Sequence, residues 1–172
     1  ARYGILWYPQ TFLVNPDGMH ILHKIEGHAT PPELVIGMSA ALLGGNQQTR
    51  PQGDNSEDPL AWMAFGNYLF TNEPGRNIEC LDAYLWCLDH GEEHIDGFRA
   101  YYREFLIQRI AYLRSYTSKA TEALLTRRDR LRATIIAGIA TDVEIQEYLR
   151  FCFWLRDEVN VLDTVAEMRN LG

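Results

Sequence analysis

The chain has 172 residues, of which 47% are hydrophobic and 12% aromatic, and its formal net charge is −7. This hydrophobic content excludes a disordered chain. The acidic balance disfavours a nucleic-acid binder, because such proteins gain affinity largely from Lys and Arg on phosphates. The sequence has no run of about 18 apolar residues, so we expect no membrane span. Composition therefore predicts a soluble globular protein.

The start of the chain and its cysteines bear on its origin. The first residue is Ala1 rather than Met, and no charged-then-apolar leader precedes a cleavage site. We therefore expect a processed chain or a part of a longer polypeptide. Three cysteines are an odd number and do not make a disulfide framework. Cysteines used for packing fit a reducing or an oxidising compartment, so the cytoplasm and the periplasm both stay open.

The first quarter of the chain carries strand patterns. Two mainly apolar runs, at 11–14 and 19–25, flank an Asn-Pro-Asp-Gly sequence at 15–18 that suits a tight turn. These runs predict a β-hairpin. The Thr-Pro-Pro-Glu sequence at 30–33 is a capping box with proline in the first helical turn, which predicts a helix through about residue 43.

The rest of the chain is predicted to be helical. The polar segment at 44–58 is rich in Gly, Gln and Asn and indicates a linker or a long surface loop. Capping residues and apolar spacing predict helices at 60–70, 77–90, 95–115, 118–137 and 142–170, the last one broken near 156–160. Short turns between consecutive helices favour antiparallel neighbours, so a helical array is expected.

The residues and predicted elements of the first quarter of the chain follow one another in a recognisable order. Tyr8, Pro9, Gln10 and Thr11 lead into an apolar strand, and the turn, second strand and Pro-Pro-Glu-Leu helix start follow. This order resembles the C-terminal half of a thioredoxin-like domain of the thiol–disulfide interchange type, over residues 2–43. In that family the matching proline is cis and lies beside the redox dithiol, which implies substrate or partner binding by these four residues. A cis-proline that only shapes the strand entry is the alternative.

The resemblance covers only half of such a domain. The half that carries Cys-x-x-Cys is absent, so the strand at 11–14 would leave one edge unpaired, and folded proteins cover such edges. A fragment of about 43 residues is also near the lower limit for independent folding. We expect another chain, upstream residues or the helices to complete the hairpin, and the protein to be part of a complex.

A small–aromatic–small pattern marks the first two predicted helices. Its residues are Trp62, Phe65, Gly66 and Leu69, then Cys80, Tyr84 and Cys87. The pattern resembles one tetratricopeptide-type helix pair, which implies stacking against neighbouring helices. The predicted fold is therefore α+β but mostly α. It has a partial thioredoxin-like hairpin and helix at 1–43, a linker at 44–58 and an antiparallel tetratricopeptide-like array at 59–172.

Few residues suggest chemistry. Cys80 and Cys87 lie two helical turns apart, about 10 Å, which is too far for an unstrained disulfide, so we interpret them and Cys152 as packing residues. His90 and His94 are a weak metal candidate, since Gly91 between them is expected to end the helix and break their shared face. No metal or other cofactor is predicted.

A basic strip lies at 119–132, and a solvated helix face is favoured over a contact with an acidic partner. No catalytic residue is predicted anywhere in the chain. We expect a non-catalytic protein-interaction or scaffold subunit. The alternative is the C-terminal part of a thiol–disulfide or peroxide oxidoreductase whose dithiol lies upstream or on a partner chain.

Overall fold

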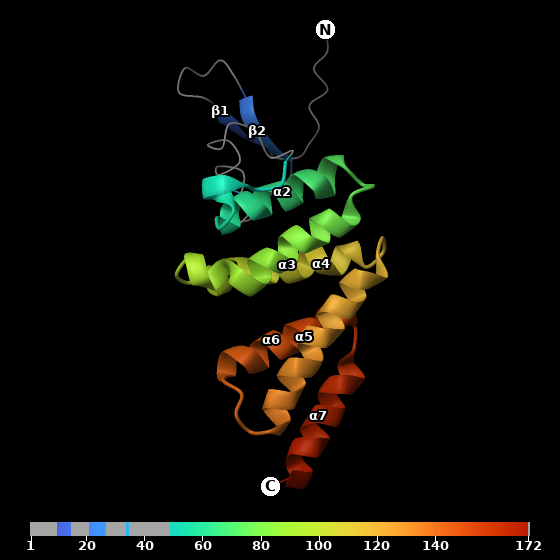
Figure 1. Ribbon diagram of the computed structural model, residues 1–172. Helices are drawn as coiled ribbons and strands as arrows, with labels where there is room; N and C mark the ends of the chain where they lie inside the picture. The colour runs from blue at the N-terminus through green and yellow to red at the C-terminus, as the bar shows by residue number, and fades with distance from the viewer. Residues whose placement is uncertain (1–9, 15–20, 27–33, 35–48, 172) are drawn as a thin grey trace. The chain divides into compact units, whose positions relative to one another are not determined.

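Helices dominate the structure. The computed structural model describes residues 10–14, 21–26, 34 and 49–171 (Figure 1). The strands β1 (Gln10–Val14) and β2 (Ile21–Glu26) pair antiparallel, with an irregularity between Leu13 and Val14. The 3-10 turn η1 (Gly53–Asn55) precedes the helices α2 (Pro59–Asn72), α3 (Asn77–His94), α4 (Phe98–Leu113), α5 (Ser118–Ile136), α6 (Asp142–Leu155) and α7 (Glu158–Leu171).

The predicted α+β fold class with a partial thioredoxin-like unit is wrong. Six helices form the described fold, and in the described residues β1 and β2 pair with no third strand. The strand pattern at 10–26 corresponds to a two-stranded ladder. A thioredoxin-like domain instead needs a larger sheet against which helices pack. Tyr8, Pro9 and, except for Leu34, the helix predicted at 31–43 lie outside the described residues.

Several helix ends follow the expected capping chemistry. The Asp58 carboxylate accepts a backbone N–H at the start of α2, where a proline occupies the first turn. Thr141 and Glu144 form a full capping box at the start of α6. The predicted break near 156–160 is confirmed, because α6 and α7 are separate helices.

The helix α3 does not end at Gly91 as predicted, but continues to His94. A β-carbon at Gly91 would lie 2.2 Å from the ring of Phe98, at the start of α4. The glycine therefore serves close helix approach and not a left-handed cap. Gly66 in α2 plays the same part, since a β-carbon there would lie 2.8 Å from the Tyr84 ring of α3.

The chain divides into two compact units, and the division falls inside α4. We call residues 1–102 the N-terminal unit and residues 103–172 the C-terminal unit, and we describe each by itself. In the N-terminal unit, α2 and α3 lie side by side (Figure 1). Cys80 and Cys87 of α3 are buried there and donate to backbone carbonyls of α2 at 3.3 and 3.4 Å, which confirms their packing role.

In the C-terminal unit, α5, α6 and α7 contact one another (Figure 1). Leucines of α5 and aromatic residues of α6 are buried in this unit, among them Leu124, Leu131, Tyr148 and Phe151. The basic strip at 119–132 is not simply a solvated face. Its Arg128 is only 8% exposed and is ion-paired, as described below.

Candidate functional site

A cavity of about 680 Å³ lies in the C-terminal unit. It is bounded by the end of α4, the start of α5 and the junction between α6 and α7. Aromatic and charged side chains line it, among them Tyr112, Arg114, Phe153, Trp154, Arg156 and Glu158. The lining combines aromatic side chains with polar and charged ones, which can hold and orient a ligand.

Three aromatic side chains form one wall of the cavity. The Trp154 ring makes edge contacts with Tyr112 and Phe153 at centroid distances of 6.2 and 5.3 Å. Its indole N–H donates to the Glu104 carboxylate at 2.9 Å, and Arg150 pairs with that carboxylate at 3.0 Å. Phe153 is 67% exposed and Tyr112 49%, so the wall is open to a ligand, and the hydrogen bond to Glu104 orients the Trp154 ring within it.

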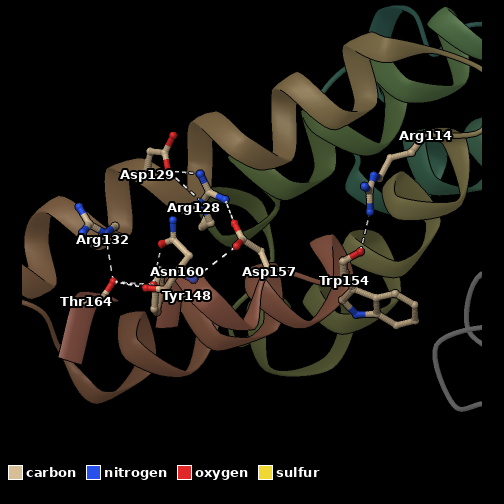
Figure 2. Close-up of polar contacts among 9 residues, drawn as sticks. All are labelled: Arg114, Arg128, Asp129, Arg132, Tyr148, Trp154, Asp157, Asn160 and Thr164. Carbon is tan, nitrogen blue, oxygen red and sulfur yellow. Dashed lines mark hydrogen bonds and ion pairs between the residues drawn. The ribbon is translucent and has the colours of Figure 1, made fainter. Parts of the chain in front are cut away.

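Arg114 connects the end of α4 to the end of α6 at the cavity. Its Nη1 donates to the carbonyl oxygen of Trp154 at 2.7 Å, as Figure 2 shows, and its Nε donates to the Thr121 hydroxyl at 3.4 Å. The carbonyl is one that the last turn of α6 leaves without a helical partner. Both acceptors are neutral, so these contacts fix the guanidinium without cancelling its positive charge.

Arg156 lies in the turn between α6 and α7, in the left-handed conformation with φ 57° and ψ 49°. Its N–H donates to the Phe153 carbonyl at 3.1 Å, and the N–H of Asp157 donates to the Cys152 carbonyl at 2.9 Å. This is the Schellman arrangement, in which glycine is usual. A side chain there costs about 1 kcal/mol. The Arg156 guanidinium makes no hydrogen bond or ion pair with other described residues.

Partly buried ionic contacts around Arg128 hold this turn in place (Figure 2). The guanidinium of Arg128 donates to the carboxylates of Asp157 and Asp129. Asp157 also accepts the backbone N–H of Asn160 at 3.3 Å, in the first turn of α7. Because Asp157 directly follows Arg156, its contacts fix the backbone that places the Arg156 side chain at the cavity.

A second set of polar contacts joins α6 to α7 behind the turn. The Tyr148 hydroxyl lies 2.7 Å from the Thr164 hydroxyl and donates to Asn160, and Arg132 donates to Thr164 at 3.0 Å (Figure 2). Burial raises the pKa of the Tyr148 phenol to about 12. The phenol therefore stays protonated at neutral pH and serves as a structural hydrogen-bonding group.

The site residues predicted from the sequence are not among those that line the cavity. Gln10 and Thr11 belong to β1, and the other two residues of that predicted site, at 8 and 9, lie outside the described residues. The partner-binding role predicted for these four residues remains untested.

His90 and His94 share a face of α3, because that helix continues through Gly91. Both rings contact the ring of Trp86, at centroid distances of 5.3 and 5.8 Å. The described residues contain no group of three or more His, Cys, Asp or Glu side chains placed to hold a metal ion. Both imidazoles contact the Trp86 ring, and the Nδ1 of His90 also lies 3.2 Å from the Glu93 carboxylate.

The cysteines have the environment of packing residues. Cys80, Cys87 and Cys152 are free thiols and all are buried. Burial raises the pKa of the Cys87 and Cys152 thiols, which disfavours the thiolate that nucleophilic and redox chemistry requires.

Neither a protein-family model, nor a curated protein, nor a solved structure matches this chain. The thioredoxin-like resemblance of residues 2–43 is thus contradicted by the helical fold and gains no support from a relative. The tetratricopeptide-like pattern has the expected close contact between Gly66 and Tyr84, but no family match accompanies it. None of the described helices combines the length and apolar character that crossing a membrane requires.

The sequence contains little indication of the cavity. Tyr112, Arg114 and Arg156 do not belong to one local motif, because Arg156 is far from the other two in the chain. One usable indication was the Phe-Cys-Phe-Trp run at 151–154, whose first two residues are buried while the last two line the cavity. A second was the predicted helix break near 156–160, which contains no glycine.

Proposed function

We propose that this protein is a non-catalytic protein-interaction module, and that a segment of its partner docks in the cavity of the C-terminal unit. The observation that carries the proposal is the aromatic wall, with Phe153 and Tyr112 largely exposed and Trp154 fixed by Glu104. Clustered aromatic side chains supply much of the binding energy at protein interfaces. A wall that is held before binding loses little conformational entropy when a partner docks.

The environment of the titratable groups supports a non-catalytic role. Arg128 and Tyr148 are engaged in contacts that join helices, and the three cysteines are buried. No observation on the described residues favours the oxidoreductase alternative. In a disulfide-reduction assay we expect no turnover by the 172-residue chain. Measured turnover would contradict the non-catalytic proposal.

Site-specific photocrosslinking tests docking at the cavity. We suggest placing benzoylphenylalanine at Phe153 or at Tyr112, and at Ile139 as a control, because Ile139 is 72% exposed and does not line the cavity. In an extract of the source cells, mass spectrometry is expected to find one partner segment attached to both cavity positions and not to the control. The synthetic segment is then expected to bind the purified protein. Equal labelling at Ile139, or no common segment, would refute docking at this site.

The strand edges of the hairpin are a further place for a protein partner. In the described residues β1 and β2 pair only with each other, and an extended partner segment that adds to a strand edge is a known mode of protein recognition. The crosslinking design extends to this edge with a probe at Gln10.

A further inference from the structure

The charged residues of the cavity give it a preference among partner segments, in addition to the preference for apolar groups that the aromatic wall gives. Building on the proposed function, we infer that the docked segment carries a carboxylate next to an aromatic or large aliphatic side chain, with the carboxylate bound by Arg156. The apolar neighbour would then lie against Trp154 and Phe153.

The charged side chains that line the cavity point to an acidic ligand. Four arginines outside the cavity lining are ion-paired with carboxylates: Arg103 with Glu147, Arg128 with Asp157, Arg132 with Glu167 and Arg150 with Glu104. The two arginines that line the cavity are not. Arg114 donates to neutral oxygens, and Arg156 has no partner among the described residues. Against these two arginines the cavity lining holds one carboxylate, that of Glu158, so the lining carries an excess of positive charge in a chain whose net charge is −7.

The backbone gives an independent reason to assign a role to Arg156. Among the described residues it is the one non-glycine residue with a positive φ. Glycine or asparagine would satisfy the same Schellman turn without strain or with less of it. No hydrogen bond or ion pair of the guanidinium with other described residues compensates for the strain. Strained residues of this kind concentrate at binding and catalytic sites.

The geometry of the two groups defines the ligand further. A planar guanidinium can donate two parallel hydrogen bonds to one carboxylate, which gives both affinity and orientation. Arg156 and Trp154 lie two positions apart at the end of α6, and both line the cavity. The carboxylate and the apolar group of the ligand therefore come from adjacent or nearly adjacent residues.

Matched peptides test this inference on the full 172-residue chain. The probes are decapeptides of Gly and Ser that carry Phe-Glu, Phe-Gln or Ala-Glu at their centre. Binding is followed by NMR through the indole N–H resonance of Trp154 and the guanidinium Nε–H resonance of Arg156. We expect saturable shifts with the Phe-Glu peptide, and affinities about ten-fold lower for the Phe-Gln and Ala-Glu peptides.

Two variants separate the role of Arg156 from general electrostatics. Arg156→Gln is expected to abolish the preference for Phe-Glu over Phe-Gln. Arg130→Gln removes an exposed arginine of α5 that does not line the cavity, so the preference is expected to remain.

The possible failures are distinguishable. Equal binding of Phe-Glu and Phe-Gln, or an unchanged preference in Arg156→Gln, would overturn the carboxylate assignment and leave docking at the aromatic wall in place. If no peptide shifts the Trp154 resonance, the inference is overturned, and the crosslinking experiment separately decides the proposed function.

Discussion

Each of the two units of this protein is stabilised internally, and the contacts that do so differ between the units. In the N-terminal unit, α2, α3 and the start of α4 approach closely at Gly66 and Gly91, where aromatic rings fill the space of a missing side chain. In the C-terminal unit, α5, α6 and α7 are joined by buried hydrogen bonds and ion pairs around Arg128 and Tyr148. Close packing tolerates no added volume. Directional polar contacts instead fix a turn precisely enough to keep a strained residue in place.

The largest effect is expected where the N-terminal unit is most tightly packed. Gly91→Ala places a methyl group 2.2 Å from the Phe98 ring, which is itself only 1% exposed and has little room to move. We expect the free energy of unfolding to fall by about 3 kcal/mol, measured by urea denaturation. The matched control is Gly75→Ala, where a β-carbon meets nothing within 4 Å. Similar urea midpoints for both variants would show that close packing is not what holds this unit.

In the C-terminal unit, the corresponding change is Asp157→Ala. It leaves the buried Arg128 with one carboxylate in place of two and removes the contact to the Asn160 N–H. We expect a loss of about 2 kcal/mol in the free energy of unfolding, because an incompletely paired buried charge is costly. Glu122→Ala, at an exposed carboxylate of α5, is the control and is expected to change stability by less than about 0.5 kcal/mol. Equal losses would argue against a structural role for the ion pair.

Tyr148 makes the stability of the C-terminal unit depend on pH in the alkaline range. Its phenol has a pKa of about 12 in the folded state against an ordinary value of 10.0, so the unfolded chain loses this proton first as the pH rises. The contribution of Tyr148 is therefore complete below pH 10 and is lost between pH 10 and about 12, by roughly 2 kcal/mol.

The test compares wild type with Tyr148→Phe by urea denaturation from pH 8 to 11, so that the other tyrosines cancel. The variant is expected to lose about 1 kcal/mol at pH 8. The gap between the two proteins is expected to narrow above pH 10 and to close near pH 11, where about half of the roughly 2 kcal/mol has been lost. A constant gap would contradict the raised pKa.

The comparison also explains how far the sequence could predict this structure. Capping residues are local, so the starts of α2 and α6 at Asp58 and Thr141 were predictable. The role of Gly91 cannot be predicted locally, because the Phe98 ring that occupies the space of its missing side chain lies in the next helix. The thioredoxin-like resemblance failed for a related reason, since a local order of strand and turn residues does not specify the sheet around it.

The candidate site was even harder to predict from the sequence than the fold. The basic strip gave no indication that Arg128 is buried, because its partner Asp157 comes from a different part of the chain. The cavity depends on the packing of four helices, and on one turn whose conformation is unusual for its residue. The local sequence indicates these features only through the Phe-Cys-Phe-Trp run at 151–154 and the helix break near 156–160.

The central claim is that the strain at Arg156 is maintained for a carboxylate ligand, and Arg156→Gly tests it most directly. Glycine relieves the left-handed conformation at φ 57°, so the free energy of unfolding is expected to rise by about 0.5 to 1 kcal/mol. In the same protein the affinity for the Phe-Glu peptide is expected to fall about ten-fold, because the guanidinium is lost. Greater stability with weaker binding is the result that the account predicts, and reduced stability or unchanged binding would contradict it.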